Sequence, residues 1–102
     1  MEWYHYLAAF FSAAFISNAV PHLVNGISGD KFPTPFSKPP GKGLSSPLTN
    51  VLWAMLNVAI GYILLRASNM TSDSILALVV FFAGFTAMSI SSALNFQKKE
   101  KE

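Results

Sequence analysis

Three long stretches without Asp, Glu, Lys or Arg divide the chain. They run from Trp3 to Gly29, from Gly43 to Leu65 and from Ser74 to Gln97. An α-helix rises about 1.5 Å per residue, so about 20 apolar residues cross the hydrocarbon core of a bilayer, which is about 30 Å thick. Each stretch is long enough for one crossing. The pattern therefore predicts an all-α integral membrane protein with three transmembrane helices.

Local signals set the expected boundaries at about residues 3–25, 47–66 and 73–96, with a long loop over residues 26–46. Pro21 lies within the first helix, where it should kink the last turns or end the helix early. Pro47 after two serines is a helix start. The capping candidates for the third helix are Thr71, Ser72 and Asp73. Because the second connection is short, we expect helices two and three to form an antiparallel hairpin.

The composition agrees with a membrane protein. Of the 102 residues, 52% are hydrophobic and only 12% are charged, too few charged side chains to cover a soluble globule. The first stretch exceeds the apolar region of about 7–15 residues in a signal peptide, and no basic residue precedes it, so we expect a retained helix. Three crossings use the whole chain, which predicts a single transmembrane domain over residues 1–102.

The lysines predict the orientation of the spans. By the positive-inside rule, the loop and the C-terminus face the cytoplasm and the N-terminus faces outward, because the opposite side carries only Arg66. The net charge of +2 is small, and we expect no nucleic-acid partner. The layout broadly resembles small three-span bacterial proteins, which implies the bacterial inner (plasma) membrane. The lysines on the cytoplasmic side are Lys31, Lys38, Lys42, Lys98, Lys99 and Lys101.

Polar side chains within the spans gather in the cytoplasmic half. Asn18 and Asn57 lie at matching depths of roughly 12–14 Å, so they could hydrogen-bond across two helices. Such residues either join helices or line a polar cleft that opens to the cytoplasm. The full set of cleft candidates is Asn18, His22 and Asn25 on helix one, Asn50 and Asn57 on helix two, and Ser91 and Asn95 on helix three.

His22 has several possible roles. It could shuttle a proton, bind a metal or haem, or be a neutral side chain bonded to the Ser17 carbonyl or a neighbouring amide. His5 lies roughly 25 Å away along the same helix, so the two histidines of one chain cannot share a metal. We predict no metal site and no resident cofactor. A haem held by His22 of two subunits is the alternative.

The loop is rich in proline and glycine, with five of the six prolines and four of the six glycines between residues 26 and 47. It could contact lipid, offer a rigid docking surface to another protein, or connect two helices passively. The start of helix two could also bind an anion or a lipid headgroup, since free N–H groups gather there. The spacing of a P-loop is absent. The anion or headgroup candidates are Lys38, Lys42, Gly43, Ser45 and Ser46.

No pair of carboxylates or catalytic triad can be assembled from this chain, so we expect no enzymatic activity. Small residues repeat every fourth position at Ala9, Ala13 and Ser17, and at Ala83, Ala87 and Ser91, which favours close helix packing. We therefore expect a noncatalytic accessory, interaction or oligomer-forming role, with the lipid bilayer and either further copies or a larger membrane protein as partners.

Two alternatives stay open. The first is an oligomeric carrier or channel for a small solute, lined by Asn18, His22, Asn50 and Asn57. The second is binding of a lipid headgroup by the loop and the N-terminus of helix two.

Overall fold

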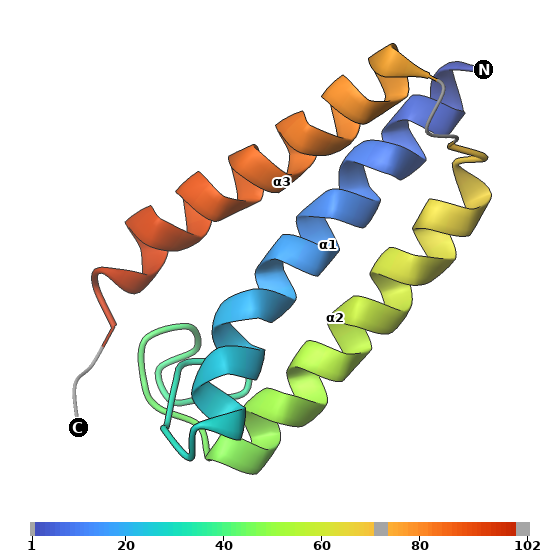
Figure 1. Ribbon diagram of the computed structural model, residues 1–102. Coiled ribbons are helices and arrows are strands. Elements are labelled where there is room, and N and C mark those ends of the chain that lie inside the picture. Colours follow the sequence, from blue (N-terminus) through green and yellow to red (C-terminus); the bar gives the residue numbers. More distant parts are fainter. Residues whose placement is uncertain (1, 71–73, 100–102) are drawn as a thin grey trace.

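The computed structural model describes residues 2–70 and 74–99, and all three of its regular elements are α-helices. They are α1 (Trp3–Ile27), α2 (Pro47–Ala67) and α3 (Ile75–Phe96) (Figure 1). Each helix is long and apolar enough to cross a membrane. The prediction of an all-α chain with three candidate membrane spans is therefore confirmed, and the boundaries differ from the expected ones by no more than two residues.

The three helices lie side by side with α1 in the middle (Figure 1). The α2 helix runs antiparallel to α1, and α3 runs parallel to α1 (Figure 1). Within the described residues, α1 packs against both neighbours, whereas α2 and α3 make no contact with each other. A packed hairpin of α2 and α3 is not confirmed, because α1 separates them.

Small residues let α1 approach both neighbours closely. Gly61 of α2 lies against the Ser12 backbone, and the Ser12 hydroxyl donates to the Gly61 carbonyl at 2.6 Å. On the other side, Gly84 of α3 lies against the Phe10 backbone with no room for a Cβ atom. Since lipid tails give apolar helices no hydrophobic reason to associate, such close packing and hydrogen bonds hold the helices together.

The two small-residue repeats have different surroundings. Ala9, Ala13 and Ser17 of α1 are buried, and the Ser17 hydroxyl lies 2.8 Å from the Ser89 hydroxyl of α3. The second repeat is instead exposed along α3, at Ala83, Ala87 and Ser91. The expected packing role therefore applies within this chain to the first repeat only.

The helix ends follow ordinary capping chemistry. The Ser46 hydroxyl accepts from the Thr49 N–H at 3.1 Å ahead of Pro47, as the sequence suggested. Ser74 caps α3 in the same way, accepting from the Ala77 N–H at 3.2 Å. Pro21 does not end α1, which continues to Ile27. The cap candidates Thr71, Ser72 and Asp73 lie outside the described residues.

Residues 28–46 form a folded loop. Phe32 and Ser45 exchange two backbone hydrogen bonds of 3.2 and 3.0 Å. The Thr34 carbonyl accepts from the Ser37 and Gly41 N–H groups at 3.1 and 3.0 Å, and the Thr34 side chain is 1% exposed. Gly41 has a φ of +74°, a conformation that suits glycine. The loop is thus an ordered structure with its own buried residues.

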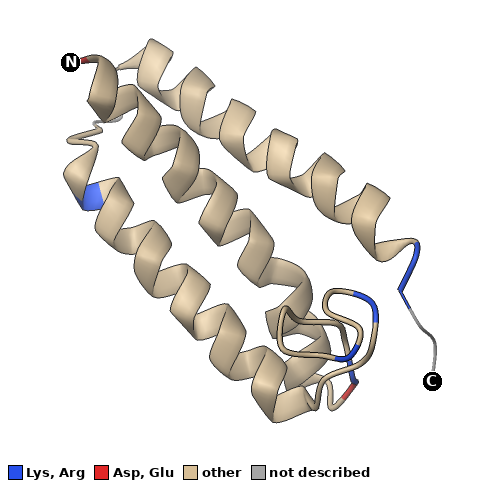
Figure 2. Ribbon diagram, turned by 180° about the vertical axis from the view of Figure 1, so that it is seen from behind, with Lys and Arg blue, Asp and Glu red and all other residues tan. Residues whose placement is uncertain are grey.

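The described charges are divided between the two ends of the bundle (Figure 2). Arg66 lies at the end where α1 begins, together with Glu2. The loop end carries Asp30 and all the other described basic residues, which are Lys31, Lys38, Lys42, Lys98 and Lys99. The fold therefore keeps the charge asymmetry that the sequence shows.

Replacing Gly84 by alanine should destabilise the bundle by about 1–3 kcal/mol, because the added Cβ atom would overlap the rigid Phe10 backbone. Tryptophan fluorescence during unfolding in detergent micelles with increasing dodecyl sulfate measures this loss. Gly61→Ala is the matched control. The atom nearest to its added Cβ atom would be in the Ile16 side chain, 2.6 Å away, and this side chain can move. Equal losses for the two variants would contradict this account of α1–α3 packing.

Candidate functional site

Asn50 joins α1, α2 and the loop at one buried point, which we call the loop clamp. Its Nδ2 group donates to the carbonyls of Phe32 at 2.9 Å and Ser46 at 3.0 Å, with a longer contact of 3.3 Å to Ser45. Its Oδ1 atom lies 2.8 Å from Nδ1 of His22 on α1. Asn50 is 0% exposed and His22 is 2% exposed. A single amide therefore fixes the loop to both helices.

Aromatic rings enclose His22. Its ring meets Phe32, Phe96 and Trp53 edge-on, with centroids 5.4, 5.7 and 6.5 Å away. Phe32 in turn contacts Phe96 at 4.6 Å, which links the loop to the end of α3. Of the two hydrogen bonds suggested for a neutral His22, the structure has the one to a neighbouring amide, that of Asn50.

Asn18 and Asn57 form the hydrogen bond that their matched depths suggested. Asn18 Nδ2 donates to Asn57 Oδ1 at 3.1 Å, and Asn57 Nδ2 donates to the Trp53 carbonyl of its own helix at 2.8 Å. Asn25 does not join this group, because its amide donates to the Pro21 carbonyl at 2.7 Å within α1. The pair connects α1 to α2 near the middle of the bundle.

The two remaining cleft candidates lie apart from these bonds. Ser91 and Asn95 of α3 are exposed, and their side chains make no hydrogen bond within residues 2–70 and 74–99. The structure thus divides the predicted polar set in two. His22, Asn50, Asn18 and Asn57 are paired between helices, whereas Asn95 lines a neighbouring cavity and Ser91 lines an open groove.

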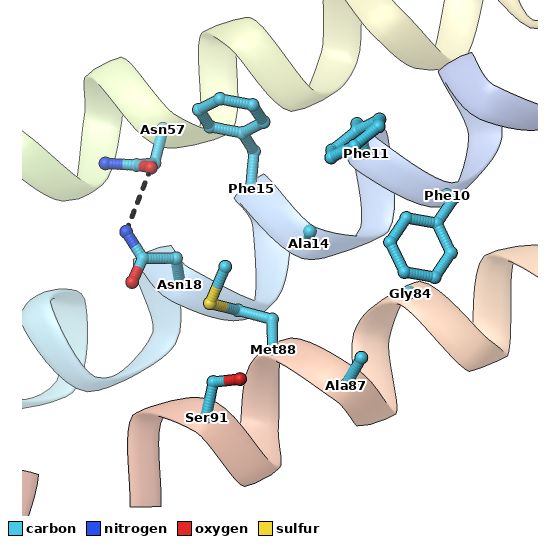
Figure 3. Close-up of a pocket in the computed structure, with 10 residues that line it drawn as sticks. All are labelled: Phe10, Phe11, Ala14, Phe15, Asn18, Asn57, Gly84, Ala87, Met88 and Ser91. Carbon is cyan, nitrogen blue, oxygen red and sulfur yellow. Dashed lines mark hydrogen bonds between the residues drawn. The ribbon is translucent and has the colours of Figure 1, made fainter. Parts of the chain in front are cut away.

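This groove, which we call the α1–α3 groove, is a cavity of about 390 Å³ (Figure 3). Phe10 and Phe11 line one end, and Asn18 and Ser91 line the other, which lies nearer the loop (Figure 3). Asn57 contributes from α2. The other residues that line the groove are Ala14, Phe15, Gly84, Ala87 and Met88. A smaller cavity of about 180 Å³ lies between the helices and the loop, and His22, Trp53 and Asn95 are among its lining residues.

The candidates for an anion site have their donors engaged inside the loop. The Gly43 N–H donates to the Pro39 carbonyl at 2.8 Å, and the Ser45 hydroxyl lies 2.6 Å from the Thr34 hydroxyl. Ser46 is occupied as the cap of α2. This leaves the Lys38 and Lys42 side chains as the charged groups of that set.

His22, the candidate haem ligand, is enclosed by aromatic rings. No group of three or more His, Asp or Glu side chains gathers as a metal site would require within residues 2–70 and 74–99. A haem iron would have to reach Nε2 of a ring that is 2% exposed and surrounded by Phe32, Phe96 and Trp53.

The structure adds functional candidates that the sequence reasoning missed. Trp53 lines the smaller cavity, and its buried Nε1 atom has no hydrogen-bond partner. Phe32 and Phe96 form the aromatic enclosure of His22. Such apolar residues are common in membrane spans, so composition alone does not distinguish them.

A scan against protein-family models and searches of curated proteins and of solved structures return no match.

Replacing Asn50 by alanine should release the loop. The variant leaves the buried His22 ring without its hydrogen-bond partner and removes one of the two hydrogen bonds to the Phe32 carbonyl, at a cost of about 1–3 kcal/mol in the free energy of unfolding. Hydrogen exchange at the Phe32 and Ser45 N–H groups should rise at least about tenfold, since about 1.4 kcal/mol corresponds to a factor of ten. Hydrogen–deuterium exchange followed by mass spectrometry, in detergent micelles, measures the exchange at these two N–H groups.

Asn25→Ala is the control for this prediction, because Asn25 bonds only to the backbone of its own helix. Its loss should be below about 1 kcal/mol. Unchanged exchange at Phe32 in the Asn50 variant would show that the loop is held by other contacts.

Proposed function

We propose that this chain is a noncatalytic integral membrane protein that serves as an accessory or interaction subunit and presents its folded loop at the cytoplasmic surface of a bacterial inner membrane. The observation that carries the proposal is the loop clamp. Asn50 is fully buried and spends its hydrogen bonds on holding residues 28–46 in one conformation. Most connections between helices are short, and a long ordered connection usually has a function of its own. A connector that only joins two helices does not need a buried side chain to hold its conformation.

The held loop has features of a docking surface. Phe36 is 66% exposed on it, and its ring lies 5.3 Å from the Trp53 ring, which supports it from beneath. Leu48, at the start of α2, is 67% exposed. Aromatic residues presented on a preorganised backbone bind partners at low entropic cost, since little has to be ordered on association. The partner would be a further copy of the chain or a larger membrane protein.

The orientation in this proposal has the N-terminus outside and both the loop and the C-terminus in the cytoplasm. Its support is the segregation of positive charge, with Lys31, Lys38 and Lys42 on the loop and Lys98 and Lys99 after α3, against Arg66 at the other end (Figure 2). The positive-inside rule relates such an excess to the cytoplasmic face.

The carrier alternative has weaker support. His22, Asn50 and Asn57 are each no more than 2% exposed, and all three are hydrogen-bonded within the chain. A permeation path needs polar groups that face water or solute. The headgroup alternative at the start of α2 is likewise weakened, because the Thr49 N–H donates to the Ser46 cap and the Gly43 and Ser45 N–H groups donate within the loop.

Single cysteines can test both the topology and the cleft, since the natural chain has none. A membrane-impermeant maleimide should label Lys42→Cys only from the cytoplasmic side and Glu2→Cys only from outside. Asn57→Cys should stay unlabelled in the membrane and react after denaturation, because the position is 2% exposed. Right-side-out and inverted vesicles provide the two accessible faces.

The reverse labelling of Lys42→Cys and Glu2→Cys would overturn the orientation. Labelling of Asn57→Cys from the cytoplasm, together with Asn18→Cys, would favour the carrier alternative over the interaction role.

Photo-crosslinking in the native membrane tests the interaction role. A photoreactive phenylalanine analogue at Phe36 should give a discrete protein adduct, identified by mass spectrometry as a second copy or another membrane protein. The control is the same analogue at Ile63 of α2, which is equally exposed at 65% but lies within a predicted span. That position should give lipid adducts alone. Absence of a protein adduct at Phe36, or identical adducts at both positions, would contradict the proposal.

A further inference from the structure

The α1–α3 groove extends from the middle of the bundle to the loop end. Its main cavity of about 390 Å³ shares Asn18, Met88 and Ser91 with a neighbouring cavity of about 220 Å³, which continues to Asn95. Gly84 and Asn95 mark the two ends on α3, eleven residues or about 16 Å apart. This length is about half the thickness of a hydrocarbon core of about 30 Å. The groove therefore matches the depth of one leaflet.

The polarity of the groove changes along its length. Phe10, Phe11 and Gly84 line the deep end, whereas Ser91 and Asn95 line the end nearer the loop (Figure 3). The side chains of Ser91 and Asn95 are exposed and make no hydrogen bond within the described part of the chain. An amide without a partner costs free energy in hydrocarbon. The occupant should therefore be apolar at its deep end and offer hydrogen-bonding groups at the other.

Positive charge lies where the polar end reaches the membrane surface. Lys98 and Lys99 follow the C-cap residue of α3, Gln97, about one turn beyond Asn95. The Lys99 Nζ atom lies 5.7 Å from the centroid of the Phe32 ring, and that ring contacts Phe96, a lining residue of the groove. An anionic group at this level would be attracted to both lysines.

We propose that the α1–α3 groove binds an anionic phospholipid from the leaflet on the loop side. One acyl chain lies between Phe10 and Met88, the ester oxygens accept hydrogen bonds from Ser91 and Asn95, and the phosphate lies beside Lys98 and Lys99. The proposal rests on the membrane topology given above and is independent of the interaction role of the loop.

A second copy of the chain fits this groove less well. All copies share one orientation in the membrane, so a neighbour docked here would bring its own Lys98 and Lys99 to the same level. Like charges at short range repel one another. A lipid phosphate has the complementary charge, and an acyl chain is far narrower than a helix, whose diameter with side chains is about 10–12 Å.

Native mass spectrometry of the purified protein can test this site. The protein is incubated in mild detergent with equal amounts of phosphatidylglycerol and phosphatidylcholine that carry the same acyl chains. We expect phosphatidylglycerol to be retained at least about tenfold more than phosphatidylcholine, since each lysine near an anionic group contributes about fivefold.

Two groove variants and one control separate the site from general lipid contact. Ala87→Phe fills the groove and should abolish retention of both lipids. The smaller change Ser91→Val should reduce lipid retention, and it tests the site if Ala87→Phe impairs folding. Ala93→Phe adds the same ring to an exposed position of α3 that does not line the groove, and it should retain lipid like the natural protein.

A charge series tests the headgroup. Lys98→Gln and Lys99→Gln should each lower the preference for phosphatidylglycerol about fivefold, whereas Lys38→Gln, with the same charge change on the loop, should have a smaller effect. Equal retention of the two lipids by the natural protein would overturn the proposal. Full retention of lipid by both groove variants, or equal effects of all three lysine substitutions, would also overturn the proposal. The same holds if the natural protein is a dimer and Ala87→Phe converts it to a monomer without lipid.

Discussion

The contact between Asn50 and His22 is the point on which the arrangement of the loop end depends. It joins α2 to α1 at 2.8 Å, and the same amide holds the Phe32 and Ser46 carbonyls. Because hydrocarbon offers no alternative partner, polar groups at this depth must be satisfied within the protein. The clamp meets that requirement and fixes the loop at the same time. The positions of Phe32 and Phe36, and hence the proposed docking surface, follow from it.

The central position of α1 has a second consequence. Because α2 and α3 both pack on α1 and, within the described residues, not on each other, a groove stays open between the two outer helices. Close contacts at Gly61 and Gly84 hold both neighbours tightly, so the groove is a property of the packing itself. The protein thus combines a closed, hydrogen-bonded side at the clamp with an open side along α3. We assign the proposed interaction role to the loop end held by the clamp, and the proposed lipid site to the open groove along α3.

The sequence allowed the number, type and approximate limits of the helices to be predicted, because uncharged stretches of this length are typical of membrane spans. It also suggested the Asn18–Asn57 bond from matched depths, and this bond is present at 3.1 Å. The packed hairpin of α2 and α3 is not confirmed, since a short connection places two helices close in sequence but does not determine which faces pack. A rigid loop was among the possibilities, but its internal contacts were not foreseen, because they join residues such as Phe32 and Asn50 that no local pattern relates.

Charge and hydropathy along the chain by themselves determined the three candidate spans and the unequal distribution of lysines, because both are local properties of the sequence. Only the tertiary structure decided which polar residues are paired and which are left open. His22 and Asn50 are separated by 28 positions in the chain, and Ser17 and Ser89 by 72. Their pairing depends on which faces of α1 meet each neighbour, and small residues such as Gly61 and Gly84 set those faces by allowing close backbone contact.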